Sequence, residues 1–301
     1  MLTQGKRALF IINRHSGIGN FFSVEDRILG VCKKHHTECT IEHTKYRAHA
    51  VALARDATTN GYDYVIAVGG DGTINEVAQG LVGTETAMGI LPRGSGNGLA
   101  RHFGIPALLP EAIDSLFSNS VVRMDTLLVN NRLSLNVSGI GFDGHIANLF
   151  ANKKIRGLLG YVRLTLGELL KFKEFDSELT IDGNMRSEKS FIIAFANSSQ
   201  YGNNIKIAPY ASVNDGNFDL TVLKKVSLRN FGFLYSFLRG KLKKSKLCDM
   251  LIAKEAIVKT SSAVPYHIDG EPCGFADTFT VVLQPSSLLV LVPDIRGISE
   301  I

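Results

Sequence analysis

The sequence contains no apolar run that approaches the roughly 20 residues of a membrane-spanning helix. It has only four cysteines among 301 residues, and these show neither metal-ligand spacing nor a dense disulfide pattern. We therefore expect reduced thiols in a cytoplasmic protein. No helical pair of histidines comes with a third ligand, which disfavours a zinc site. The net charge of +5 does not indicate nucleic-acid binding, although it suits an anionic nucleotide or membrane surface.

The pattern of apolar residues predicts two domains. Over residues 1–120, short apolar strands alternate with helical segments through short links, which indicates a doubly wound parallel α/β sheet. From about residue 121, alternating segments and Asn-Asn and Asp-Gly turns predict an antiparallel β-sandwich over residues 121–301. The predicted fold class is thus α/β plus β, and the last strands could return to the first domain.

A glycine-rich turn follows the apolar strand at residues 64–68. Gly69, Gly70 and Gly72 can take positive φ and let a ligand approach the backbone, while Thr73 can cap the following helix. Consecutive free N–H groups at a helix start bind phosphate, and Asp71 could hold the magnesium ion that a nucleotide carries. The alternative is an ordinary strand-to-helix turn.

A second glycine-rich loop follows the next apolar segment, 87–91. It contains Gly94, Ser95 and Asn97 in the run Gly-Ser-Gly-Asn-Gly. Because loops at the carboxyl ends of neighbouring strands converge on one crevice, the two loops could hold one nucleotide.

Together the two loops resemble the catalytic domain of diacylglycerol kinases and sphingosine kinases. NAD kinases and phosphofructokinase-like enzymes share the Gly-Gly-Asp-Gly of residues 69–72, but the second loop is closer to the lipid-kinase branch. Gly94-Ser95 and Gly98 follow the sphingosine-kinase pattern rather than the bacterial diacylglycerol-kinase pattern, which leaves the lipid open.

The resemblance implies ATP and Mg²⁺ as cofactors. It places the nucleotide against residues of several loops: Asn13, Thr44, Gly69, Gly70, Asp71, Gly72, Thr73, Asn75, Gly94, Ser95, Asn97 and Asp269. Without it, Asn13 belongs to an ordinary loop and Thr44 is a hydroxyl at a strand end.

Two acidic residues of the second half acquire roles from the resemblance. Glu271, in Asp269-Gly270-Glu271, is the family's proton acceptor from the lipid hydroxyl, as phosphoryl transfer to an alcohol needs. Asp143 would meet the polar head of the substrate. Taken alone, Asp269-Gly270 is a hairpin turn and Asp143 caps a helix that starts at Gly144.

The resemblance also implies a second divalent-metal site, away from the nucleotide. Asp215 would supply a carboxylate, and Ser212 and Asn217 would supply backbone carbonyls, an oxygen-only set that suits magnesium or calcium. The alternative is a simple Asp-Gly turn.

Two further segments are predicted as helices. Residues 158–172 have leucines at helical spacing, which suits a core or one wall of a lipid groove. Residues 228–247 form an aromatic helix with a basic end, which could rest on an anionic bilayer or be an ordinary solvated helix end.

We interpret the chain as an ATP-dependent lipid kinase that phosphorylates a hydroxyl of a diacylglycerol-like or sphingoid lipid at a membrane surface. Asp71 and Glu271 are the expected catalytic residues. A peripheral membrane association is expected, and a homodimer is left open. The alternatives are an NAD kinase and a catalytically silent lipid-binding relative, which would be expected to lack Asp71 or Glu271.

Overall fold

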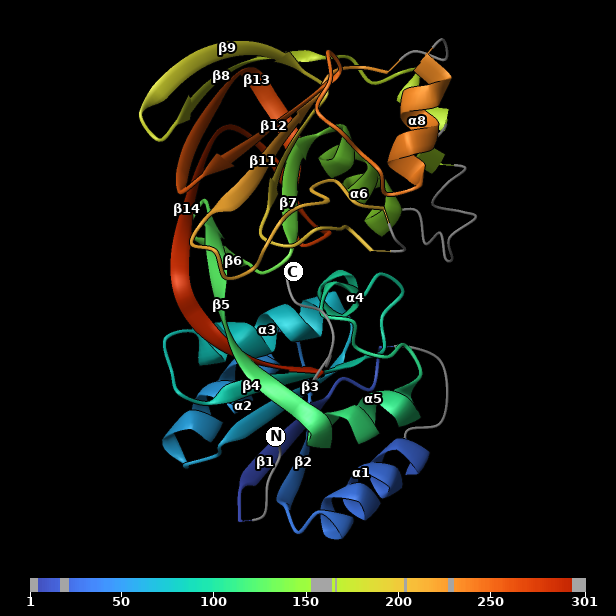
Figure 1. Cartoon of the computed structure of the whole chain (residues 1–301), viewed down its shortest axis with the longest axis vertical. Coiled ribbons are helices and arrows are strands. Elements are labelled where there is room, and N and C mark those ends of the chain that lie inside the picture. The colour runs from blue at the N-terminus through green and yellow to red at the C-terminus, as the bar shows by residue number, and fades with distance from the viewer. Residues whose placement is uncertain are drawn as a thin grey trace. The chain divides into compact units, whose positions relative to one another are not determined.

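The computed structural model describes residues 5–16, 22–152, 164–165, 167–202, 205–226 and 230–293. The chain forms two compact units (Figure 1). Unit 1 is Met1–Met124 with Ser286–Ile301, and unit 2 is Asp125–Pro285. Two strands, β5 (Asn119–Val129) and β14 (Glu271–Pro293), each belong partly to both units.

The sheet of unit 1 is parallel, in the order β2, β1, β3, β4 and the end of β14. β14 joins where Val290 lies opposite Met88. β3 and β4 are buried at every position, as their continuous apolar runs predict. The other bounds are β1 (Arg7–Ile12), β2 (Glu38–His43), β3 (Tyr64–Gly69) and β4 (Ala87–Pro92).

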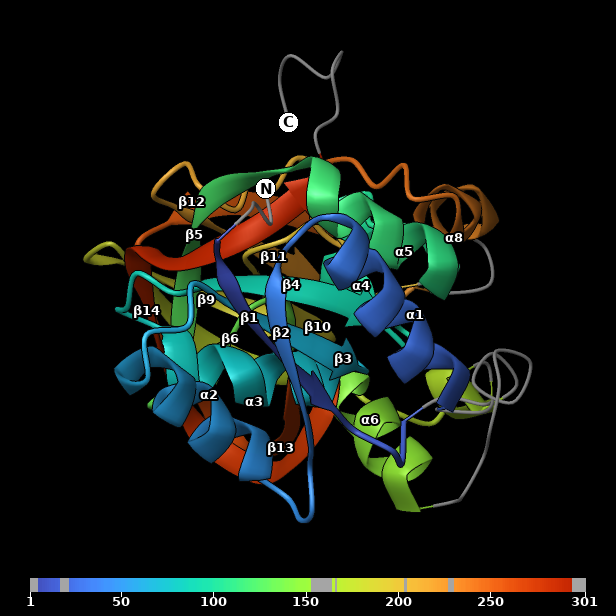
Figure 2. The same ribbon diagram turned by 90° about the horizontal axis from the view of Figure 1, so that it is seen from below.

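Helices cover both faces of this sheet, with α2 and α3 on one face and α1 and α5 on the other (Figure 2). α2 and α3 approach closely at Gly80, where an added Cβ would lie 2.6 Å from the Cβ of Ala54. The bounds are α1 (Phe22–Lys34), α2 (His49–Thr59), α3 (Asp71–Leu81), α4 (Gly98–His102), α5 (Leu109–Ser115) and a 3-10 turn (Leu116–Ser118).

Unit 2 is built from antiparallel strands in the order β12, β11, β10, β7, β13 and β14, with β8 and β9 added beside β13 and β6 paired with β5. The bounds are β6 (Arg132–Ser134), β7 (Val137–Gly141), β8 (Phe175–Ile181), β9 (Asn184–Ser190), β10 (Ile192–Ala196), β11 (Phe218–Leu223), β12 (Cys248–Ala253) and β13 (Glu255–Ile268).

Two apolar clusters make up the core of unit 2. One contains Phe195, Phe218 and Phe279 among other buried residues of the strands. The other contains Phe142, Phe191 and Leu242 and includes partly buried side chains of α8 (Phe231–Leu238). Phe142 opens the remaining helix, α6 (Phe142–Asn152).

The structure confirms the α/β plus β fold class. The last strands of the chain form the single long β14, and its end joins the sheet of unit 1. The Asn130-Asn131 turn is confirmed, with φ of 48° and 61° between β5 and β6. Of the predicted helix 158–172, residues 158–163 and 166 lie outside the described residues.

Candidate active site

The turn between β3 and α3 is shaped by close packing rather than by unusual dihedral angles. Gly69, Gly70 and Gly72 do not have positive φ, so that expectation was wrong. A Cβ on Gly69 would lie 2.5 Å from the Cβ of Thr73, so only glycine fits there. Thr73 does not cap α3, because the helix begins at Asp71. The Thr73 hydroxyl instead accepts a hydrogen bond from Asn13 Nδ2 at 3.0 Å.

The second glycine loop is held by Asn97, whose φ of 50° places it in the left-handed region. Its Oδ1 accepts a hydrogen bond from Gly94 N at 2.9 Å, and its Nδ2 donates to Gly94 O at 2.8 Å. This reciprocal pair closes the loop on itself just before α4. Ser95 is left exposed at the tip of the loop.

Asp71 joins the two glycine loops. One carboxylate oxygen accepts a hydrogen bond from Asn97 N at 2.9 Å, and the other accepts one from Gly98 N at 3.0 Å. The backbones also touch, since a Cβ on Gly94 would lie 2.8 Å from Gly70 Cα. A further bond runs from Arg93 N to Gly69 O at 2.7 Å. The two loops therefore form one rigid edge of backbone.

The loops after β1 and β2 lie at the same edge of the sheet. Asn13 N donates to Val68 O at 3.1 Å, and Thr44 N donates to Ile12 O at 3.0 Å. Asn13 and Thr44 are thus brought to the ends of the strands that carry the glycine turn. Asn75, one turn into α3, accepts a hydrogen bond from Gln79 Nε2 at 2.7 Å. Residues 17–20 of the predicted first loop lie outside the described residues.

Sequence reasoning missed Glu76, which fixes the segment after Thr44. Its Oε1 accepts a hydrogen bond from Ala48 N at 2.9 Å, where Ala48 has a φ of 64°. A left-handed alanine is disfavoured, so this carboxylate stabilises an otherwise costly turn. The Asn75-Glu76 pair directly after the glycine turn was the available signal.

In unit 2, Asp143 belongs to a buried polar group. Its Oδ2 accepts a hydrogen bond from Tyr201 OH at 2.9 Å and lies 3.3 Å from His267 Nε2. His267 is 3% exposed, and its Nδ1 accepts a hydrogen bond from Gly270 N, which leaves the proton on Nε2 for Asp143. Neither His267 nor Tyr201 was predicted for this site.

The glycines around Asp143 make room for it. A Cβ on Gly139 would lie 2.0 Å from Asp143 Oδ2, and one on Gly144 would lie 2.4 Å from the carbonyl oxygen of Pro265. The alternative in which Asp143 caps a helix that starts at Gly144 was wrong, because α6 begins at Phe142 and Asp143 lies in its first turn. The spacing of glycines in 139–144 thus reflects how tightly α6 packs on β7 and β13.

Asp269 and Gly270 form the two-residue turn between β13 and β14, with φ of 50° and 85°. The carboxylate of Asp269 accepts hydrogen bonds from Ser134 Oγ, Leu135 N and Asn136 N at 2.8–2.9 Å. The turn is therefore clamped to the connection between β6 and β7. Glu271 follows it as an exposed first residue of β14.

Asp125 holds the loop of residues 212–217, where a second metal ion was expected. Its side chain is 1% exposed and accepts a hydrogen bond from Gly216 N at 2.8 Å. Asp215 Oδ1 accepts one from Asn217 N at 3.0 Å, and the Ser212 hydroxyl donates to Asn214 Oδ1. Burial, and then the charge of Asp215, raise the pKa of Asp219 to about 6.

Within the ranges that the structure describes, no three His, Cys, Asp or Glu side chains form a cluster able to hold a metal ion. The same part of the chain contains no helix long and apolar enough to cross a membrane.

Comparisons with known proteins agree with this geometry. Residues 7–129 match the model of the diacylglycerol kinase catalytic domain, and residues 136–292 match that of the YegS C-terminal NAD kinase beta sandwich-like domain. The chain is 31% identical over 252 residues to a Chromohalobacter salexigens protein named "Probable lipid kinase YegS-like", covering 81% of this chain and 80% of that protein. The chain belongs to the diacylglycerol kinase catalytic-domain family.

Two other proteins are similar to this chain in sequence or in fold. A Bacillus subtilis protein named diacylglycerol kinase is 29% identical over 88% of this chain and 90% of its own. A crystal structure of a diacylglycerol kinase from Bacillus anthracis has the same fold, with a TM-score of 0.74, 20% identity and coverage of 96% of this chain and 97% of that one. The predicted family is confirmed, and with it a phosphotransferase that uses an alcohol acceptor.

Proposed function

We propose that this chain is an ATP-dependent lipid kinase that transfers the γ-phosphoryl group to a hydroxyl of a diacylglycerol-like or sphingoid lipid. The observation that carries the proposal is the link from Asp71 to Asn97 and Gly98, which holds two glycine loops as one edge of backbone. Backbone N–H groups at such an edge stabilise phosphate charge without any reorganisation.

The nucleotide would lie along this edge of unit 1. Gly69–Thr73 and Gly94–Asn97 would contact its phosphates, and Asn13, Thr44 and Asn75 would line the adjoining loops. Asp269 is assigned a nucleotide contact as well, although three bonds to residues 134–136 already orient its carboxylate.

Magnesium suits the residues present. Asp71 presents a carboxylate oriented by two backbone N–H groups, and carboxylate oxygen is the ligand that magnesium prefers. When bound, the ion would neutralise charge on the phosphoryl oxygens. A second ion would be held by Asp215 with the carbonyl oxygens of Ser212 and Asn217 and would brace the loop that Asp125 already anchors.

Glu271 would accept the proton of the lipid hydroxyl, and Asp143 would accept a hydrogen bond from the polar head of the substrate. Both are carboxylates, which are suited to these two tasks. The relatives named diacylglycerol kinase and lipid kinase support a lipid acceptor, and the choice of lipid rests on the experiment below.

The test is the transfer of radiolabelled phosphate from ATP and Mg²⁺ to detergent-dispersed diacylglycerol, sphingosine, ceramide or phosphatidylglycerol. We expect label in at least one lipid. Glu271→Gln should reduce turnover by about 100-fold or more, since a positioned base contributes that much. Glu255→Gln is the matched control, because it removes the same charge from an exposed carboxylate on β13.

Two other results would contradict the proposal. NAD is included as a control acceptor, because the second matched domain is NAD kinase beta sandwich-like, and label only in NAD would indicate an NAD kinase. Label in none of these acceptors, with ATP binding intact, would indicate a catalytically silent lipid-binding relative.

A homodimer stays a prediction, which light scattering of the purified protein tests.

A further inference from the structure

The positive charge of this protein is concentrated in one segment. Residues 224–246 contain eight lysines and arginines and no aspartate or glutamate. Removing these eight from the 33 basic residues leaves 25 against 28 acidic residues, so the rest of the chain has a net charge of −3. One short segment therefore decides the sign of the net charge.

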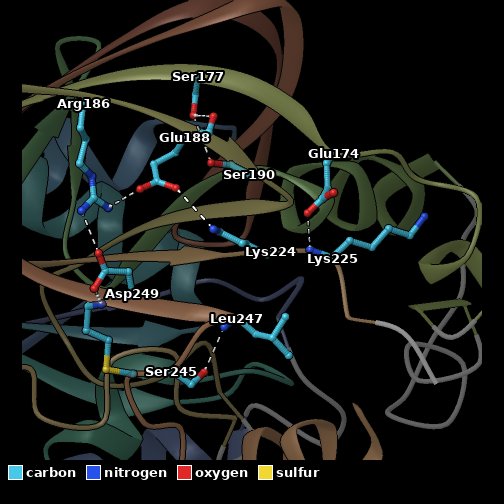
Figure 3. Close-up of polar contacts among 11 residues, drawn as sticks. Glu174, Ser177, Arg186, Glu188, Ser190, Lys224, Lys225, Ser245, Leu247 and Asp249 are labelled. Carbon is cyan, nitrogen blue, oxygen red and sulfur yellow. Dashed lines mark hydrogen bonds and ion pairs between the residues drawn. The ribbon is translucent and has the colours of Figure 1, made fainter. Parts of the chain in front are cut away.

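Some of these basic groups are already engaged, and Figure 3 shows the contact of Lys224 with Glu188. Lys224 lies 3.9 Å from Glu188, and Lys244 lies 2.8 Å from Asp249. Lys225 Nζ donates to the carbonyl oxygens of Leu170 and Phe172 at 3.1 and 2.6 Å. These three lysines hold the segment against neighbouring strands and loops.

Four of the others lie in residues 239–246, which we call the basic strap, and Arg229 lies outside the described residues. Arg239, Lys241, Lys243 and Lys246 are exposed, and none of them pairs with a carboxylate among the residues that the structure describes. With the engaged Lys244, the strap has five cationic groups in eight residues. It is a compact source of positive potential.

The backbone of the strap is held firmly at its start. Lys241 N donates to Ser236 O at 2.9 Å, and the Ser236 hydroxyl donates back to Lys241 O at 2.6 Å. Gly240, with a φ of 66°, ends α8 in the left-handed conformation usual for this position.

Leu242 anchors the middle of the strap. It is 1% exposed and belongs to the second apolar cluster, while the lysines on either side of it are exposed. Further along, Ser245 N donates to Cys248 O at 2.7 Å, which ties the end of the strap to β12. The lysines are thus presented on a fixed backbone rather than on a loose loop.

The helix before the strap is aromatic and carries no charge. α8 reads Phe-Gly-Phe-Leu-Tyr-Ser-Phe-Leu. Phe233 and Phe237 pack partly against the second apolar cluster, whereas Tyr235 is 54% exposed. The Arg239 guanidinium lies 5.7 Å from the centre of the Tyr235 ring. An aromatic ring beside exposed cations is the composition of a segment that lies at the membrane–water interface.

We propose that α8 and the basic strap form a docking surface for an anionic lipid bilayer. The lysines attract acidic head groups, and Tyr235 enters the head-group layer, where a ring with a polar end is stable. This proposal deepens the proposed function. It rests on that function in one respect, because a lipid substrate is the reason why the protein meets a bilayer. An uncharged aromatic helix beside the strap favours a bilayer over a nucleic acid.

The test measures cosedimentation of the full chain with two kinds of vesicle. One contains phosphatidylcholine alone, and the other contains in addition about 30% phosphatidylglycerol, an anionic lipid. We expect binding to the anionic vesicles only, weakened by salt because surface charge is screened. The triple variant K241E/K243E/K246E should bind about 100-fold more weakly, since each lysine near the surface contributes about fivefold.

The matched control is K34E/K254E/K259E. It changes the net charge equally, from +5 to −1, at three lysines that are likewise exposed. Binding of this control close to wild type, together with loss of binding in the strap variant, would support the surface. Equal loss in both variants would overturn it, because net charge alone would then explain binding.

Two further outcomes separate this proposal from the proposed function. A strap variant that phosphorylates detergent-dispersed lipid normally but fails on vesicles would support the surface. The proposal would be overturned if the wild-type protein did not bind anionic vesicles, or if a nucleic-acid competitor displaced it from them, even with kinase activity present. Absence of any kinase activity would leave the vesicle measurement unaffected.

Discussion

The carboxylate of Asp71 accepts a hydrogen bond from the backbone N–H of Asn97 at 2.9 Å, across 26 residues of sequence. Its second oxygen accepts another from Gly98 N. The residue expected to organise magnesium therefore also joins the two loops that we assign to the phosphates. One side chain connects the position of the metal to the shape of the phosphate site.

We expect Asp71→Ala to reduce turnover by at least 100-fold and to lower the free energy of unfolding by about 2 kcal/mol, because two backbone donors lose a charged acceptor. Steady-state kinetics and thermal unfolding measure the two effects. Asp56→Ala, an exposed carboxylate on α2, is the control and should change neither. Ordinary activity in a folded Asp71→Ala variant would contradict the assignment of the site.

A second prediction concerns the close approach of the loops. In Gly94→Ala, the new Cβ would lie 2.8 Å from Gly70 Cα and 2.7 Å from Asn97 Oδ1, so the loops must separate. We expect the KM for ATP to rise about tenfold, because a shift of a few tenths of an ångström misplaces several amides at once.

The control for this change is Gly30→Ala on α1, where an added Cβ meets nothing within 4 Å. It should leave the KM for ATP unchanged and stabilise the protein by about 0.5–1 kcal/mol, since alanine loses less backbone entropy than glycine in a helix. A normal KM in Gly94→Ala would show that the loops need not touch.

A third prediction concerns the group around Asp143. Tyr201→Phe removes the hydrogen bond of 2.9 Å to its carboxylate without changing the packing of the ring. We expect the KM for the lipid to rise about fivefold while the KM for ATP stays constant, because a hydrogen bond of this kind contributes about 1 kcal/mol. Tyr210→Phe, at a tyrosine that is 74% exposed, is the control. An equal rise in both KM values would indicate a general structural defect instead.

A fourth prediction concerns pH and the ion pairs of Asp249 with Lys244 and Arg186, of which Figure 3 shows the one with Arg186. Burial alone would raise the pKa of Asp249, but hydrogen bonds from Lys244 and Arg186 outweigh it, so the pKa lies below its ordinary value. The ionised form therefore stabilises the fold above the unfolded-state pKa of about 3.9, and this stability is lost as the pH falls through the lower folded-state pKa.

Chemical unfolding at several pH values tests this sign. Asp249→Asn should lower the free energy of unfolding by about 1 kcal/mol at pH 6, because the partners are partly solvated, and the difference should shrink below pH 4. The control Asp56→Asn should show no such dependence. A difference that grows as the pH falls would contradict the direction of the pKa shift.

Much of the fold could be read from local patterns. The apolar runs that became β3 and β4 and the Asn130-Asn131 turn were all predicted, because these features depend on neighbouring residues. The lipid-kinase resemblance was likewise carried by two short motifs. Helix starts were less predictable, since α3 and α6 begin two residues before the expected Thr73 and Gly144.

The polar contacts of the site could not be predicted in the same way. The glycines of the first turn were expected to supply positive φ, but Gly69 is needed for the space that Thr73 occupies. His267 was not predicted, yet it lies 3.3 Å from Asp143, which is 124 residues away in the sequence. Spacing along a chain does not report which side chains meet across a sheet.

The sequence by itself determined the family and the alternation of strands and turns, because apolar periodicity and glycine loops act over a few residues. Only the tertiary structure decided that Asp71 holds the second loop, that Asp143 meets His267, and that the end of β14 pairs with β4 in unit 1. These contacts depend on how distant segments pack, and a hydrogen bond or a strand pairing forms only where packing brings its two partners together.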